Sequence, residues 1–224
     1  MDRLRAVARP EQIEGMARYG LAARNRLGIS MPGLRTLGKK IGKDHALALR
    51  LWESGIQEAR ILSSLVADPG ALTEEQMEAW VVDLDSWDVC DQVCMNLFEK
   101  SPLVLKKIAE WSRREETFVK RAAFSLIACL AWHDKAAPDS LFLNFLPIIR
   151  REAVDERNYV KKAVSWALRH IGKRNPSLNR AALKAATEMR ALESRAARWI
   201  ASDAIRELES ESVQKRLRKK AASG

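Results

Sequence analysis

The sequence is organised around the stretch DLDSWDVCDQVCMN, residues Asp83–Asn96. One face of a helix over this stretch would carry, at intervals of four, three and four residues, Trp87, Asp91, Cys94 and Phe98. Asp91 is the acidic member of this otherwise apolar row. Burying a carboxylate beside an indole is costly unless a cation, a set of donors or a cationic ligand offsets that cost. Asp91 is therefore a candidate functional residue.

Helical periodicity extends outward from this stretch over almost the whole chain. Proline and glycine fall between the periodic segments, and Val and Ile do not alternate with polar residues as they would in strands. Capping patterns mark several helix starts, namely Thr73 with Gln76, Asp44, and Ser86. The expected helices lie near residues 10–19, 31–42, 44–54, 56–67, 73–84, 86–99, 102–113, 116–132, 140–152, 157–173, 177–190 and 193–209.

A weak internal repeat relates several of these helices. Each has a polar-to-small-to-apolar rhythm around one alanine: Ala59, Ala122, Ala163 and Ala196. Short connections force antiparallel helix pairs, and the spacing is consistent with pairs that repeat roughly every 30–40 residues. The sequence thus predicts an all-α, HEAT-like superhelix (α-solenoid) with a basic concave surface. We expect one domain over residues 1–210 and a basic, partly disordered C-terminal tail over residues 211–224.

The charge balance favours a polyanionic partner. Lys and Arg number 39 against 29 Asp and Glu, which gives a formal net charge of +10 and a pI near 9.8. A single charge run is usually only a solvated face, but here basic pairs recur along the body of the chain, which favours nucleic acid. No uncharged apolar run reaches the length of a membrane span, so we expect a cytoplasmic protein with no membrane contact. Cys90, Cys94 and Cys129 fall inside helical patterns and are expected to be core residues, not metal ligands.

An aromatic side chain lies among cations on the helix expected at 157–173. Trp166 falls on the side opposite the apolar face and shares its stripe with Lys162, Arg169 and Lys173. An indole interleaved with cations is typical of a surface where bases or sugars meet phosphates. The alternative is that Trp166 covers an adjoining helix.

On the helix expected at 116–132, Lys120 points outward and Arg121 lies at the border of the apolar face. The planar fork of Arg121 suits a phosphate, but it would equally suit an ion pair with Asp91. Four other tryptophans fall on stripes that indicate core positions: Trp52, Trp80, Trp111 and Trp132. His133 ends its helix, where a favourable contact with the helix dipole is the commoner role.

Three motifs together resemble one family. In chain order they are Ser86-Trp87-Asp88-Val89-Cys90-Asp91, Val119-Lys120-Arg121-Ala122-Ala123 and Tyr159-Val160-Lys161-Lys162-Ala163-Val164-Ser165-Trp166-Ala167-Leu168-Arg169. They are similar to motifs of the AlkD-type DNA alkylation-repair glycosylases, and the resemblance spans most of the chain. This family is all-helical and HEAT-like, and it hydrolyses the N-glycosidic bond of cationic N3- and N7-alkylated purines.

The resemblance implies that Asp91 is the catalytic carboxylate, that Trp87 and Trp166 flank the sugar of the damaged nucleotide, and that Arg121 contacts the backbone. Where related enzymes carry two aromatics before the second tryptophan, this chain has only Tyr159. Lys120, Lys162, Arg169, Lys173 and Tyr159 join Arg121 as candidate DNA contacts. Tyr19 is a weaker candidate from the N-terminal region.

Two classes of function remain open at this point. The first is a monomeric glycosylase that acts on alkylated purines in double-stranded DNA without a metal or cofactor. The second is a helical-repeat module that binds damaged or distorted DNA, or a protein partner, without catalysis, since the resembled family also includes members that bind DNA without excising a base. The two classes differ in whether Asp91 is needed for base release.

Overall fold

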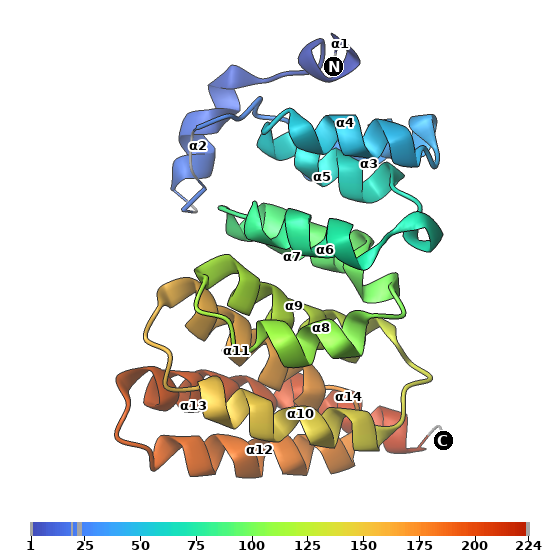
Figure 1. Cartoon of the computed structure of the whole chain (residues 1–224). Coiled ribbons are helices and arrows are strands. Elements are labelled where there is room, and N and C mark those ends of the chain that lie inside the picture. The colour runs from blue at the N-terminus through green and yellow to red at the C-terminus, as the bar shows by residue number, and fades with distance from the viewer. Residues whose placement is uncertain (1, 19, 22–23, 223–224) are drawn as a thin grey trace. The chain divides into compact units, whose positions relative to one another are not determined.

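The structure is a computed structural model that describes residues 2–18, 20–21 and 24–222, and within these residues every regular element is a helix (Figure 1). The chain divides into two compact units, residues 1–105 and 106–224. The all-α prediction is confirmed, whereas a single domain over residues 1–210 stays a prediction. Tyr19 lies outside the described residues.

Short helices open the first unit, and longer antiparallel ones follow. They are α1 (Asp2–Arg5), α2 (Ile13–Ala17), α3 (Met31–Ile41), α4 (His45–Glu53), α5 (Gln57–Val66), α6 (Glu74–Val82) and α7 (Trp87–Asn96). Single 3-10 turns lie at Pro10–Gln12, Pro69–Ala71 and Phe98–Lys100. Within this unit α5 is central, because it packs against α3, α4 and α7.

The second unit begins within α8 and continues to the end of the chain. Its helices are α8 (Val104–Trp111), α9 (Thr117–His133), α10 (Asp139–Glu152), α11 (Asn158–Gly172), α12 (Pro176–Arg190), α13 (Arg195–Leu208) and α14 (Glu211–Ala222). Helix α9 is buried without interruption from Val119 to Ala131. It packs along α11, which in turn packs against α13, so the second helices of successive pairs form a row.

Side-chain caps form where the sequence indicated them, with one exception. The Thr73 hydroxyl accepts a hydrogen bond from the Gln76 N–H at 3.2 Å, and the Asp44 carboxylate accepts one from the Leu47 N–H at 2.8 Å. Each satisfies a donor that the first helical turn cannot. Ser86 occupies the N-cap position of α7 but makes no side-chain cap bond. Its hydroxyl is bonded to the side chains of Arg26 and Asp88 instead.

Two buried tryptophans stack in parallel in the first unit. The ring centroids of Trp52 and Trp80 lie 4.2 Å apart with an interplanar angle of 0°. The Trp52 indole N–H donates to the Asp83 carboxylate at 2.9 Å, and the Arg60 guanidinium lies 5.1 Å from the centroid of the same ring. Trp52, Trp80 and Trp111 are buried, which confirms their predicted core positions.

A buried carboxylate attaches the segment before α3 to α5. Glu58 is 1% exposed and accepts hydrogen bonds from the backbone N–H groups of Leu27 at 3.0 Å and Gly28 at 2.9 Å. Gly28 has φ +74°, and a Cβ added there would lie 2.0 Å from the carbonyl oxygen of Arg9. Glycine is required at this position both for its backbone conformation and for the close approach of the Arg9 backbone.

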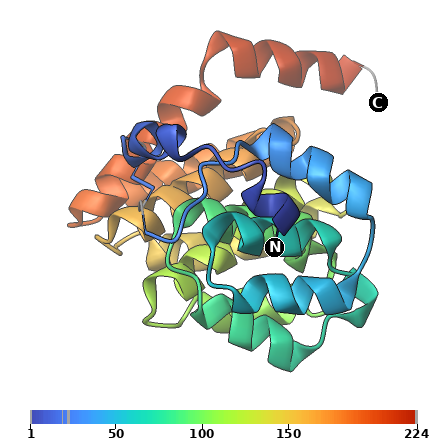
Figure 2. The same cartoon turned by 90° about the horizontal axis from the view of Figure 1, so that it is seen from above.

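The C-terminal segment is helical where the sequence indicated a basic, partly disordered tail. Residues 211–222 form α14, whose apolar side is made by the buried Val213 and Leu217, one turn apart. This helix packs against α12 and α13 and lies at the edge of the second unit, drawn in red in Figure 2. Among the described residues, no helix has the length and apolar character needed to cross a membrane.

We expect Gly28→Ala to destabilise the protein more than Gly55→Ala does. Both glycines have positive φ, which costs a residue with a Cβ roughly 1–2 kcal/mol, but only at Gly28 does the added Cβ meet backbone. The free energies of unfolding of the two variants, measured by urea denaturation, should differ by at least about 1 kcal/mol. Equal losses would contradict the close packing of the Gly28 segment against Arg9.

Candidate nucleic-acid interface

Helix α7, in the first unit, holds the first two candidate residues. Trp87 and Asp91 are half-buried on successive turns, while the next members of the same row, Cys94 and Phe98, are fully buried. The apolar end of the row therefore anchors α7 in the core, and the end with the indole and the carboxylate reaches the surface. The two side chains lie on one helical face, as the spacing predicted.

A buried ion pair fixes the start of α7. The side chain of Arg26 is 2% exposed, and its guanidinium donates to the Asp88 carboxylate at 2.8 Å and to the Ser86 hydroxyl at 3.0 Å. Removing one partner of such a pair leaves a buried charge uncompensated, which is strongly destabilising. This contact joins the segment before α3 to the first turn of α7, and so positions the backbone from which Trp87 projects.

In the second unit, α9 places Arg121 and Lys120 in buried surroundings. Arg121 is 6% exposed and donates from Nη1 to the backbone carbonyl of Tyr159 at 2.7 Å. The ring of Tyr159 packs against that of Phe118, with centroids 5.2 Å apart. Two candidate residues, Arg121 and Tyr159, thus touch directly, and the arginine ties α9 to the first turn of α11.

The outward orientation predicted for Lys120 is wrong. Lys120 is 7% exposed, and its ammonium group pairs with the carboxylates of Glu152 at 2.8 Å and Asp155 at 3.5 Å. The end of α10 and the connection that follows it bring both acidic residues over this part of α9. Because desolvation makes a buried ammonium costly, the two carboxylates offset that cost.

Helix α11 presents the Trp166 stripe as the sequence indicated, but its cations differ in their surroundings. Lys162 is exposed. Arg169 pairs with Asp203 at 3.3 Å and with Glu207, and Lys173 pairs with Glu207 at 2.7 Å. The two acidic residues project from α13 and locally balance these two cations. The two cations also affect Glu207. Their hydrogen bonds lower the pKa of its carboxyl group, although burial acts in the opposite direction.

The structure contains an aromatic cluster around Trp166 that was not predicted from the sequence. The His170 ring lies edge-on to Trp166 at 5.7 Å and 5.6 Å from Trp132, and Trp132 in turn stacks on His133 at 4.8 Å. Trp132 is 47% exposed, so its predicted core position is wrong. The sequence signal that could have revealed the contact is the spacing of Trp166 and His170, four residues apart on one helix.

Burial controls the protonation of His170. Desolvation, followed by the positive charges of Lys173 and Arg169, lowers the pKa of this imidazole to about 3. The ring is therefore neutral near pH 7 and contributes an aromatic surface without adding charge.

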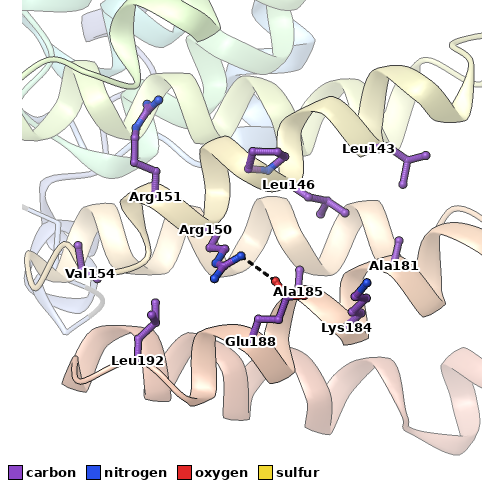
Figure 3. A pocket seen from close by; sticks show the side chains of 11 residues that line it. Leu143, Leu146, Arg150, Arg151, Val154, Ala181, Lys184, Ala185, Glu188 and Leu192 are labelled. Atoms are coloured by element: carbon purple, nitrogen blue, oxygen red, sulfur yellow. Dashed lines mark hydrogen bonds and ion pairs between the residues drawn. The ribbon is translucent and has the colours of Figure 1, made fainter.

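An apolar groove elsewhere in the second unit contains none of the candidate residues. It lies between α10 and α12, has a volume of 640 Å³, and is crossed by an ion pair between Arg150 and Glu188 at 3.0 Å (Figure 3). The side chains of Leu143 and Val154 on its wall are 43% and 51% exposed. The groove is separate in sequence from the α7, α9 and α11 motifs.

The chain matches one known protein family over most of its length. The model of one family, described as DNA alkylation repair enzyme, matches residues 1–208. The chain belongs to this family. The match covers all three motifs identified in the sequence and every candidate residue on α7, α9 and α11.

One solved structure supports the fold of this DNA alkylation repair family member. It belongs to "a new family of proteins related to the HEAT-like repeat DNA glycosylases with affinity for branched DNA structures". It is 19% identical, with a TM-score of 0.77 over 97% of this chain and 94% of that chain. A designed armadillo repeat protein in complex with the peptide (KR)4 is 14% identical and covers 96% of this chain and 87% of its own, with a TM-score of 0.38. No curated protein matches the chain.

We expect acid to destabilise the family member through His170. The folded-state pKa lies below the unfolded value of 6.5, so the unfolded state binds an extra proton between about pH 6.5 and pH 3. As the pH falls through this window, this residue should lower the free energy of unfolding by up to about 1.4 kcal/mol per pH unit. His170→Gln should remove that part of the slope in urea titrations at successive pH values, whereas His133→Gln, at an exposed histidine, should keep it. Equal slopes for the two variants would contradict a buried, neutral His170.

Proposed function

We propose that the protein is a DNA glycosylase that hydrolyses the N-glycosidic bond of cationic N3- or N7-alkylated purines in duplex DNA, as a step of base excision repair. The observation that carries the proposal is the half-buried carboxylate of Asp91 one turn after Trp87, in a chain of the DNA alkylation repair enzyme family. We further propose that it acts as a monomer in the cytoplasm, without a metal or cofactor.

The chemistry needs one well-placed carboxylate. Alkylation at N3 or N7 makes the purine cationic, so the bond from the sugar C1′ to the base can break with its electron pair passing to the base nitrogen. The base then leaves neutral, and the positive charge moves to the deoxyribose as an oxocarbenium ion. Asp91 stabilises this ion and accepts a proton from the water whose oxygen bonds to C1′. No acid is needed to protonate the leaving base.

The indoles have a complementary task. The negative face of an aromatic ring attracts a cation, and the attraction strengthens where water is excluded. Trp87 lies next to the carboxylate on α7, and Trp166 lies on the cationic stripe of α11. In the proposed mechanism each ring stabilises the positive charge that develops on the sugar.

Cations of the second unit would hold the DNA backbone. Lys162 is exposed and suited to a direct phosphate contact, whereas Arg121, 6% exposed and bonded to the Tyr159 carbonyl, must become more exposed before its planar fork can reach a phosphate. Lys120, Arg169 and Lys173 are paired with carboxylates, so a direct contact from any of them requires exchange of an ion pair for a phosphate. This division predicts unequal contributions from the proposed contacts.

A second candidate function is binding to branched or distorted DNA without base excision. The observation that favours it is the solved structure of similar fold, whose family is described as having affinity for branched DNA structures. A protein of that kind would use Trp87 and Trp166 for recognition and would release no base.

We expect Asp91→Asn to abolish most base release while leaving DNA binding intact. Loss of the carboxylate removes stabilisation of the oxocarbenium ion, for which a loss of about 100-fold or more in rate is typical. The measurement is release of free 7-methylguanine from methylated duplex DNA under single-turnover conditions, with duplex affinity measured in parallel.

The matched control is Asp88→Asn, the same change on the same helix. It breaks the buried pair with Arg26, so stability should fall, but the folded fraction keeps the Asp91 carboxylate and should lose far less base release than Asp91→Asn does. No release by the intact protein, with duplex binding retained, would favour the second candidate function.

We expect Lys162→Ala to weaken binding to duplex DNA uniformly across sequences. Loss of one phosphate contact should reduce the magnitude of the slope of log K against log salt concentration by about 0.9. Fluorescence anisotropy between about 50 and 200 mM salt measures that slope. Arg180→Ala, at an exposed arginine of α12 that is not a candidate contact, should leave it unchanged. Equal slopes for Lys162→Ala and the intact protein would remove Lys162 from the interface.

A further inference from the structure

A basic pocket lies in the second unit, where the ends of α9 and α11 meet α14. Its volume is 360 Å³, within the range of cavities that hold one small ligand. Five cationic side chains line it: Lys135, Lys173, Arg174, Arg216 and Lys220. None of the described residues that line it is acidic. The cavity therefore concentrates positive charge in a small, partly desolvated volume.

Most of these cations are held in place by neutral groups. Arg174 donates to the carbonyl oxygens of Asp134 at 2.7 Å and of Ala131 and Ala137 at 3.1 Å. Lys220 donates to the carbonyls of Lys173 at 3.2 Å and Arg174 at 2.9 Å. Backbone carbonyls position these groups without cancelling their full charge. Lys173, by contrast, pairs with the carboxylate of Glu207.

The crowding has a measurable electrostatic consequence. Burial, followed by the charges of Lys135, Arg174 and Arg216, lowers the pKa of Lys220. An anion in the cavity would relieve this repulsion between the cations, because it would interact with several positive charges at once.

Aromatic surface adjoins the charges. Trp132, which is 47% exposed, and His170 both line the cavity. Because the His170 ring stays neutral near pH 7, it acts there as an aromatic wall. His133 stacks on Trp132 and supports the indole. A ligand that satisfies this lining needs both an anionic group and a flat ring.

We propose that this pocket binds one unpaired nucleotide of DNA, with its phosphate among the cations and its base on Trp132. A base inside a duplex is covered on both faces by its neighbours, so it can stack on a protein ring only after it leaves the stack, whereas an unpaired base is available directly. Inorganic phosphate would satisfy the charges but leave the indole unused. The pocket adjoins the proposed duplex-binding stripe, since His170 contacts Trp166 on the same helix. The choice of DNA rests on the proposed function, whereas the ring-and-phosphate chemistry does not.

The test compares a labelled blunt duplex with the same duplex carrying a single-stranded oligo-dT overhang. We expect the intact protein to bind the overhang form more tightly, and Trp132→Ala or Arg216→Glu to lower that preference by roughly tenfold, as expected for loss of one base stack or phosphate contact. Trp199→Ala and Arg218→Glu are matched controls. Trp199 is a comparably exposed indole on α13 beneath Lys161, and Arg218 is an exposed cation of α14 outside the pocket.

Each result decides the proposal. Equal affinity of the intact protein for the two duplexes would overturn it, as would an equal loss of the preference in the control variants. Competition by inorganic phosphate as strong as that by thymidine monophosphate, with no effect of Trp132→Ala, would show a plain anion site and would also overturn it. Failure of the proposed glycosylase function gives a different result, because Asp91→Asn and the intact protein would then be equally inactive while the overhang preference persisted.

Discussion

Small buried side chains recur on the second helices of the pairs, in both units. Ala59 on α5, Ala122 on α9 and Ala163 on α11 are each 0% exposed, and Ala196 on α13 is 1% exposed. A small residue lets two helix backbones approach closely, and interiors packed in this way leave few voids. Burial of the repeated alanine in both units is consistent with the helical-pair repeat that the sequence indicated.

The cationic side chains of the second unit differ in the groups that surround them. Lys120, Arg169 and Lys173 are each paired with carboxylates from the neighbouring helical repeat, so they contribute to the cohesion of the second unit. A polyanion approaching these residues competes with internal partners, whereas at Lys162 it meets an exposed ammonium group. The basic pocket differs again, since carbonyl groups hold Arg174 and Lys220 in place. Three kinds of cation therefore differ in the desolvation and rearrangement that binding would require.

Much of the helical fold could be predicted from the sequence, because periodicity and capping are local properties. The helices expected at 116–132 and 157–173 correspond to α9 and α11 almost residue for residue, and the Thr73 cap forms as its pattern indicated. A helical wheel gives the direction of a side chain around its own axis, but it does not give the neighbour that covers it. Lys120 is buried because the end of α10 brings Glu152 over it, and Trp132 is exposed because α9 extends to the rim of the pocket.

The candidate site could be predicted only in part, for a related reason. Trp87 and Asp91 share a helix, so their common face follows from spacing alone, whereas the contact of Arg121 with the Tyr159 carbonyl depends on how α9 meets α11. Helix α14 was not predicted from the sequence because the segment is highly charged. Two apolar residues, Val213 and Leu217, are nevertheless enough to pack it against its neighbours.

The parallel stack of Trp52 and Trp80 has a spectroscopic consequence. Two indoles whose centroids lie 4.2 Å apart with parallel rings couple their electronic transitions, and both belong to the first unit. Loss of this coupling would report on the first unit, whereas Trp111, Trp132, Trp166 and Trp199 lie in the second unit. A chain of two compact units need not unfold in one cooperative step. Comparing the loss of the Trp52–Trp80 coupling with a signal from the second unit would therefore show whether the two units unfold together.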